Sequence, residues 1–228
     1  MKEKEMIKRR IPIIFVAVLN LALTGALWSQ VTGAITQESE RQSKPLLWIL
    51  YELGKDYDCF VTIEEGWLEG EAGNKLESAD TRRTLKDVGL IQELEQLRRI
   101  VPNFGYQFDP VNPRIVHVID ERLRSLPGYG LERTIARLDY GGTAYHLPTA
   151  IGKQGIPIAS PSGMSTHEQA DYNTVVHVNG SGLTVRGALS NFIDLNGRSL
   201  RVLWIARTKL EPRAISNVYY PWAGAPKQ

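Results

Sequence analysis

Cysteine is nearly missing from this sequence, because Cys59 stands alone among 228 residues. A chain with one cysteine cannot close an internal disulfide, so its stability must come from a hydrophobic core. Cys59 lies in DCFVTIEE, an alternating stretch that predicts a strand. In such a place cysteine usually acts as a small buried apolar side chain. We therefore expect a buried, unreactive thiol.

An excess of either charge is also missing. The sequence has 27 Lys and Arg against 25 Asp and Glu, a formal net charge of +2. The basic surplus lies in the first ten residues, MKEKEMIKRR, and the rest of the chain is close to neutral. A neutral body has no basic face with which to displace counterions from DNA or RNA. This excludes nucleic acid as an expected partner.

Phosphate-binding and nucleophile motifs are incomplete. In VNGSGLTV, Gly180 and Gly182 fit the dinucleotide fingerprint, but Val185 occupies the place of its third glycine. No Lys-Ser/Thr pair follows, which excludes a P-loop, and SPSGMS lacks the spacing of a nucleophile elbow. We interpret Asn179-Gly180 as a tight turn and Thr184 as the N-cap of a helix.

The segment HEQAD comes nearest to a metal motif. A zincin helix carries His at its first and fifth positions with Glu as the base, whereas here Asp171 replaces the second His. His167, Glu168 and Asp171, with His177 as a further ligand in space, are the candidate metal ligands, and a solvated loop is the alternative that we favour. We assign no catalytic residue, no metal and no cofactor.

A long apolar run is present near the start of the chain. Residues 11–28, IPIIFVAVLNLALTGALW, carry no charge and follow Lys8, Arg9 and Arg10, which is the pattern of an export signal. The most apolar part spans about 13 residues, as in a signal peptide, but the full run of about 18 approaches a membrane span. We predict a signal peptide or N-terminal membrane anchor at 1–29. The chain is then exported, periplasmic or extracellular, and tethered to the inner membrane if the segment stays uncleaved.

The rest of the chain alternates predicted helices and strands, which indicates an α+β fold. We expect a polar linker at 30–43, one α+β module at 44–125, a second at 126–210, and an aromatic tail at 211–228. The segments LLWILYELGKDYDCFVTI and YHLPTAIGKQGIPI both run helix, glycine, strand, which favours an internal repeat. Each module is expected to be βαβ-type (split βαβ), a short sheet with helices packed on it.

Several local elements are expected within the modules. Apolar spacing predicts a helix at 45–55 and a second helical stripe through Leu90, Leu94, Leu97 and Val101. FGYQFD and RIVHVID, joined by PVNP, predict a hairpin. The glycine-rich, acidic stretch 65–79 predicts an exposed loop. The carboxylate pairs Glu64-Glu65 and Asp120-Glu121 close strands, where we expect them to be solvated.

The second module resembles a known family over about Leu138–Thr208. GGTAYHLPTAIGKQGIPI and VVHVNGSGLTVRGALSNFI…RVLWIAR are similar to the short N-terminal (STN-like) domain of secretins and TonB-dependent receptors, in which a helix and strand precede a strand–turn–helix–strand. The resemblance implies a small α+β fold and an interaction role in a bacterial envelope, without catalytic residues. The matching apolar positions are Leu147, Ile151, Ile156, Leu183, Val185, Leu189 and Trp204.

The aromatic end of the chain supplies the last expectation. In ISNVYYPWAGAPKQ, the side chains of Tyr219, Tyr220 and Trp222 either fold back over the sheet or form an interface with a partner. We therefore expect an exported, non-catalytic envelope interaction module with a protein partner in the cell envelope. The alternative is a secreted metal-dependent hydrolase that uses the HEQAD loop.

Overall fold

The computed structural model describes residues 45–76, 88–160, 175–190, 193, 195–196, 201–209 and 215–219. All of these lie within one compact unit, Pro45–Gln228. The expected leader at 1–29 and linker at 30–43 lie outside the described residues.

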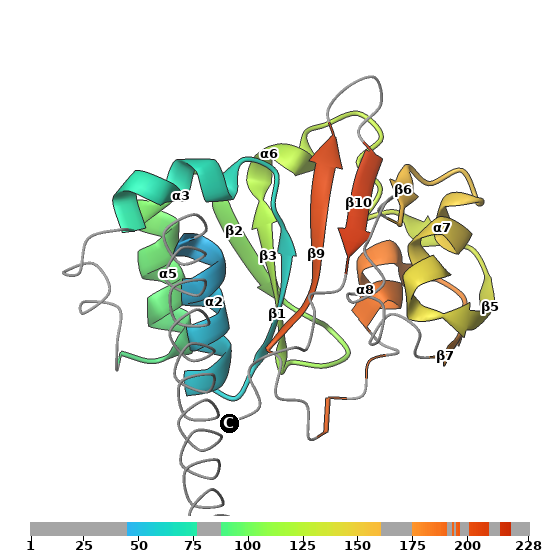
Figure 1. Cartoon of the computed structure of the whole chain (residues 1–228), viewed down its shortest axis with the longest axis horizontal. Helices are drawn as coiled ribbons and strands as arrows, with labels where there is room; N and C mark the ends of the chain where they lie inside the picture. The colour runs from blue at the N-terminus through green and yellow to red at the C-terminus, as the bar shows by residue number, and fades with distance from the viewer. Residues whose placement is uncertain are drawn as a thin grey trace, which may run out of the picture. The chain divides into compact units, whose positions relative to one another are not determined.

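The centre of this unit is a mixed six-stranded sheet with the order β2-β3-β1-β9-β10-β6 (Figure 1). The strand β1 pairs in parallel with β3 on one side and with β9 on the other. The strands are β1 (Phe60–Glu64), β2 (Phe104–Phe108), β3 (Ile115–Asp120), β6 (Ile158–Ala159), β9 (Val202–Lys209) and β10 (Ile215–Tyr219).

Two small two-stranded sheets and a set of helices pack around the six-stranded sheet, so the fold is mixed α+β. The small sheets pair β4 (Thr134–Ile135) with β8 (Leu183–Thr184) and β5 (Leu138–Thr143) with β7 (Val175–Gly180), both antiparallel. The helices are α2 (Pro45–Asp56), α3 (Leu68–Leu76), α5 (Leu90–Ile100), α6 (Glu121–Arg124), α7 (Leu147–Gly152) and α8 (Val185–Ser190), with the 3-10 turn η1 (Ala144–His146) before α7.

The strand residues alternate between two hydrophobic cores. Val61 and Val116 belong to the first core, with α2, α3 and α5, whereas Phe60 and Ile115 belong to the second, with α7 and α8. All five residues of β1 are buried because both faces of this central strand are covered. Figure 1 shows the first group of helices and the second on opposite sides of the sheet.

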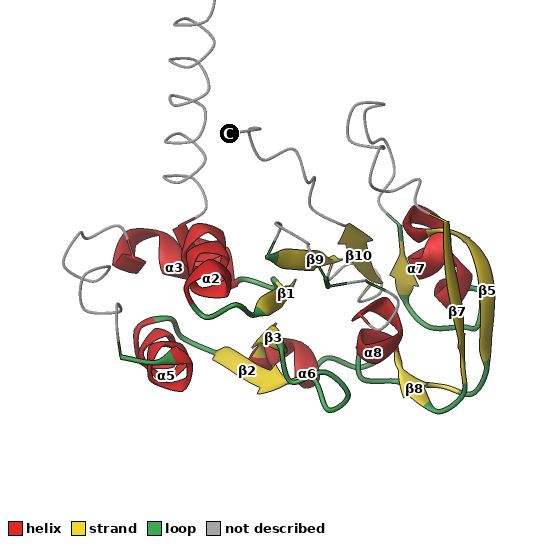
Figure 2. Cartoon of the chain, turned by 90° about the horizontal axis from the view of Figure 1, so that it is seen from below, coloured by secondary structure: helices red, strands yellow, loops and turns green. Residues whose placement is uncertain are grey.

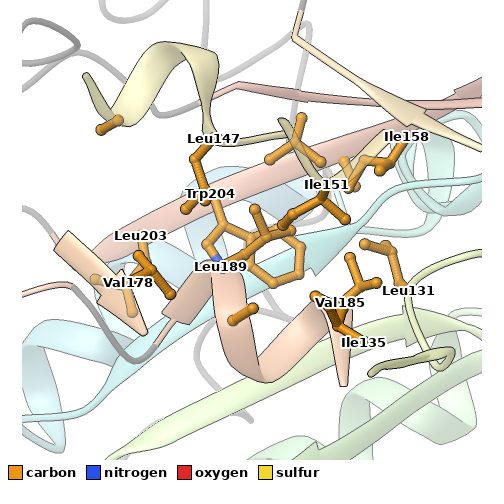
Figure 3. Packing of buried hydrophobic residues seen from close by; sticks show 14 of the residues in the cluster. Leu131, Ile135, Leu147, Ile151, Ile158, Val178, Val185, Leu189, Leu203 and Trp204 are labelled. Atoms are coloured by element: carbon orange, nitrogen blue, oxygen red, sulfur yellow. The ribbon is translucent and has the colours of Figure 1, made fainter. Parts of the chain in front are cut away.

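A β-bulge in β9 directs two large side chains into the second core. Val61 lies opposite Val202 but Thr62 lies opposite Trp204, so Leu203 is an extra residue in β9. Because of this shift, Leu203 and Trp204 both enter the second core, and both are fully buried. The indole of Trp204 lies among Leu147, Ile151 and Leu189 there (Figure 3).

Most of the predicted elements are confirmed. The helix expected at 45–55 is α2, the stripe from Leu90 to Val101 lies on α5 and the turn after it, and β2 and β3 form the antiparallel hairpin. Pro148 lies in the first turn of α7, where its missing N–H costs little. Thr184 caps α8 as predicted, since its Oγ1 accepts the N–H of Gly187 at 3.0 Å.

Two local predictions are wrong. The stretch expected to be an exposed loop at 65–79 contains the helix α3, whose Leu68, Ala72 and Leu76 form a fully buried i, i+4, i+8 stripe between glycines and acidic residues. The dipeptide Asn179-Gly180 stays in β7, and the turn before α8 instead uses Gly182, which has a φ of 71°.

The sheet consists of two three-stranded parts whose main elements follow in a similar order, apart from α3 in the first part and β7 and β8 in the second. In the first part α2 leads to β1, and α5 leads to β2 and then β3; in the second α7 leads to β6, and α8 leads to β9 and then β10. The strand β3 is antiparallel to β2 and parallel to β1, and β10 is antiparallel to β9 and parallel to β6. The β1–β9 pairing joins the two parts.

A glycine near the end of each leading helix permits close packing on the strand that follows. A Cβ at Gly54 would lie 3.0 Å from the carbonyl oxygen of Cys59, and one at Gly152 would collide with the carbonyl oxygen of Ile158. These glycines occupy the same place in the two helix–glycine–strand segments from which an internal repeat was predicted.

We predict that Gly152→Ala lowers the free energy of unfolding by about 1–3 kcal/mol, because the main chain of β6 must move. The control is Gly70→Ala in α3, where a Cβ meets no atom within 4 Å. There the substitution should raise stability by about 0.5–1 kcal/mol. Urea denaturation followed by circular dichroism measures both, and equal effects of the two variants would contradict the packing argument.

Candidate functional site

A buried ion pair connects the two three-stranded parts. Glu64 at the end of β1 is fully buried, and Arg186 in the first turn of α8 is 4% exposed. Arg186 donates from Nε to Oε1 of Glu64 at 2.5 Å and from Nη2 to Oε2 at 3.0 Å. The hydroxyl of Tyr129 donates to the same Oε2. Both carboxylate oxygens of Glu64 therefore accept hydrogen bonds from residues in distant parts of the chain.

The electrostatics of this group follow from burial and pairing. Burial opposes the charge on Arg186, but the attraction and hydrogen bonds of Glu64 outweigh it, so the pKa of Arg186 is raised. Burial, followed by the negative charge of Glu64, also raises the pKa of Tyr129 far above its usual range. Both side chains therefore stay protonated throughout the neutral range, and neither is available as a base.

A second buried chain of hydrogen bonds crosses β1 and β3. Thr62 Oγ1 lies 2.7 Å from Nδ1 of His117, and Nε2 of His117 lies 3.0 Å from Oδ2 of Asp109. Oδ1 of Asp109 also accepts the N–H groups of Val111 and Asn112, at 2.9 and 2.8 Å. Burial alone would raise the pKa of Asp109, but these hydrogen bonds reverse the effect and lower it.

The order hydroxyl, imidazole, carboxylate is that of nucleophile-activating triads. In this protein, however, Thr62 and His117 are fully buried and Asp109 is 3% exposed. Thr62 lies on the central strand β1 with a neighbouring strand on each side, so a substrate carbonyl has no access to its hydroxyl. The arrangement satisfies buried polar atoms and fixes the side chains between the strands.

The candidate metal ligands are not brought together in the described part of the chain. His167, Glu168 and Asp171 lie outside the described residues. His177 is exposed on β7, opposite Gly141, and its Nδ1 lies 3.3 Å from the position of a Cβ on that glycine. Within the residues that the structure describes, no group of three His, Cys, Asp or Glu side chains could hold a metal ion.

The candidate interface residues fall at the end of β10. Tyr219 is the last residue of this strand and its main chain lies opposite Ile205 of β9, while Tyr220 and Trp222 lie outside the described residues. Residues 215–219, which we expected in the tail, thus form an inner strand of the sheet. The sequence pattern did not show this strand, because ISNVY is short and adjoins glycine, proline and polar residues.

The expectation of solvated carboxylates at strand ends is wrong for Glu64 and Asp120, because both are fully buried. Asp120 caps α6, accepts the main-chain N–H of Trp67 at 2.8 Å and pairs with Arg122 at 2.7 Å. One feature of the sequence does indicate that Glu64 is buried. Glu64 follows Phe60 and Thr62 at alternate positions of the strand, so its side chain points into the same core.

An exposed surface lies on the two-stranded β5–β7 sheet. Along β7, Val175, His177 and Asn179 are exposed, and the alternate residues Val176 and Val178 are 7% and 5% exposed. Val175 is 64% exposed, which is unusual for a strand valine. We call the outward side of these strands, with Asp139 and Gly141 of β5, the ribbon face.

Comparison with known proteins identifies no relative. No family model, no curated protein and no solved structure matches the chain. Among the helices of the described residues, none is both long and apolar enough to cross a membrane.

We predict that Glu64→Gln destabilises the protein by about 3–5 kcal/mol, because it leaves the buried Arg186 with only the exposed carboxylate of Glu132, 3.5 Å away, as a counterion. The double variant Glu64→Leu/Arg186→Met removes both charges and should lose less than the single variant. As an exposed control, Arg98→Gln, whose partner is Glu95 at 3.7 Å, should change stability by less than about 1 kcal/mol. If the double variant lost as much stability as the two corresponding single variants together, the result would contradict this interpretation.

We also predict an acid-sensitive contribution from Asp109. Its pKa is lowered in the folded state, so the unfolded chain binds the proton more tightly. The stabilisation is therefore fully present above the unfolded value of about 3.9 and is lost as the pH falls through the folded value. Asp109→Asn should flatten the decline of the unfolding free energy below about pH 5, as measured by urea titration at a series of pH values. The exposed Asp139→Asn variant is the control, and identical acid limbs for Asp109→Asn and the wild type would refute the assignment.

Proposed function

We propose that this chain is an exported, non-catalytic module that binds a protein partner in the cell envelope. The observation that carries the proposal is the ribbon face, on which exposed Val175 and His177 alternate with buried valines of β7. Alternation gives a strand one side that packs on the core and another that is free for contact. The buried Thr62–His117–Asp109 chain favours a structural interpretation of the only triad-like group among the described residues.

The location rests on the sequence. Basic residues followed by the uncharged run at 11–28 support a signal peptide or N-terminal anchor, and hence a periplasmic or extracellular position. If the segment is uncleaved, it tethers the module to the inner membrane. Tyr220 and Trp222, which follow β10 in the sequence, would supply a second contact with the partner.

We further propose that the described unit is a tandem of two βαβ-type modules. The similar order of the main elements in the two three-stranded parts supports a duplication, with the second module extending through β10 to residue 219. An STN-like second module is supported by the order α7–β6, then β7–β8–α8–β9, and by the burial of its matching apolar positions other than Leu183, which is partly buried. Leu147, Ile151, Val185, Leu189 and Trp204 are all fully buried.

We predict that the ribbon face is the contact surface. Photo-crosslinking in intact cells of the native host tests this prediction. A photoreactive amino acid replaces Val175, and the same substitution at Val111, which is 69% exposed in the β2–β3 loop, is the control. We expect a discrete adduct from position 175 in the envelope fraction and none from position 111. An adduct from both positions or from neither would overturn the contact.

Two further outcomes would overturn other parts of the proposal. Recovery of the full-length chain from the cytosol would refute export. Stoichiometric zinc in the purified protein, lost in His167→Ala, would instead support the secreted metal-dependent hydrolase with ligands from His167, Glu168, Asp171 and His177.

A further inference from the structure

Strand β2 forms one free edge of the six-stranded sheet among the described strands. Figure 2 shows no described helix or strand beyond it, since α5 lies against one face of the sheet and α6 against the other. Natural edge strands are usually protected by a charge, a proline, a bulge or a very short length. The sequence of β2, FGYQF, has five residues and none of these protections.

The opposite edge, β6, differs in each respect. It has only two residues, and Gly152 of α7 lies against the carbonyl oxygen of Ile158. The next main-chain N–H, that of Ser160, donates to Oγ1 of Thr149 at 3.2 Å. The helix α7 therefore occupies the hydrogen-bonding groups of this edge. Among the described residues, the outward main-chain groups of β2 have no partner except the N–H of Phe104, which donates to the carbonyl of Val101 at 3.3 Å.

The hydrogen-bond pattern shows which groups of β2 face outward. Glu121 donates its N–H to the carbonyl of Asn103, and Asp109 donates its N–H to the carbonyl of Ile115, both at 2.9 Å. Positions 103, 105, 107 and 109 therefore face β3 in this antiparallel pair. The residues whose main chain faces the free edge are Phe104, Tyr106 and Phe108.

We propose that β2 pairs antiparallel with β2 of a second copy of this chain, with Tyr106 on the two-fold axis. The sequence of the strand fits this arrangement, because it reads nearly the same in both directions. Tyr106 then lies opposite its own copy in a hydrogen-bonded pair, and Phe104 lies opposite Phe108. All three aromatic side chains lie on the side of the first core, where Tyr106 and Phe108 are only partly buried. In the dimer, these aromatic side chains of the two copies cover one another.

The charges on the other side of the strand are also self-complementary. A Cβ at Gly105 would collide with the carboxylate of Glu121, so this carboxylate lies over Gly105. Arg124 donates from Nη2 to Oε1 of Gln107 at 2.7 Å. Because the two-fold axis sets Gly105 opposite Gln107 of the second copy, Glu121 of one chain approaches Arg124 of the other. The strand itself is uncharged. The hydroxyl of Tyr106 donates to Oε1 of Glu95 at 2.9 Å, and Arg98 pairs with this carboxylate at 3.7 Å.

The test is sedimentation velocity of the full-length chain in a mild detergent, over a wide concentration range. We expect a monomer–dimer equilibrium for the wild type. Tyr106→Lys places two ammonium groups at the axis and should weaken the dimer at least about tenfold, with an unchanged circular dichroism spectrum. The control Val111→Lys adds the same charge in the loop beyond β2 and should leave the equilibrium unchanged. A wild type that stays monomeric, or a dimer that is insensitive to Tyr106→Lys, overturns the proposal.

A cysteine crosslink gives an independent readout that does not depend on the stability of the Lys variant. Opposed residues of a hydrogen-bonded antiparallel pair have Cα atoms about 5.5 Å apart, within the range of a disulfide. Tyr106→Cys should therefore form a covalent dimer under mild oxidation, and Val111→Cys should not. An equal yield from both positions, or none from Tyr106→Cys, contradicts the two-fold pairing. Because β2 and the ribbon face are separate, these results and the photo-crosslinking at position 175 succeed or fail independently.

Discussion

The parallel pairing of β1 with β9 is the contact on which the rest of the structure depends. It joins strands that are about 140 residues apart in the sequence, and it makes one sheet out of two three-stranded parts. The fully buried Glu64 at the end of β1 and Arg186 of α8, the helix that leads into β9, strengthen the same junction. An ion pair of this kind is expensive to desolvate, and so it favours the one register in which both partners meet.

The side of the sheet that faces the second core contains several buried polar side chains among its apolar ones. Thr62, Glu64 and His117 alternate with apolar residues on β1 and β3, and each is fully buried with a partner. The bulge at Leu203 places Trp204 beside His117, with ring centroids 6.3 Å apart, and directs the indole N–H to Ser190 at 3.1 Å. Buried groups of this kind are costly when left unpaired. The polar pairs and the bulge thus select the same alignment of β1, β3 and β9.

Local patterns in the sequence predicted local structure well, and the reasons are physical. Helix α2, the α5 stripe, the β2–β3 hairpin and the Thr184 cap all depend on residues within a few positions of each other. The partners of Glu64 could not be predicted in this way. Arg186 is 122 residues away, and the approach depends on a strand pairing that no local period encodes. The helix α3 was hidden for a different reason, since glycines and acidic residues outnumber its narrow buried stripe.

The two edges of the sheet explain why association of this chain would end at two copies. In the second three-stranded part, the outer edge of β9 is filled by β1 of the same chain. The equivalent edge in the first part is that of β2, which has no such strand beside it among the described residues. If another copy repeated the β1–β9 junction head to tail, its β6 would pair with β2 of the first copy. Repetition of this contact would produce an open filament. The helix α7 prevents this, because Thr149 and Gly152 occupy the outer edge of β6. Among the described strands one edge of the sheet is closed and one is open. Pairing of strand edges is then limited to a two-fold contact between identical edges, and such a contact closes on itself.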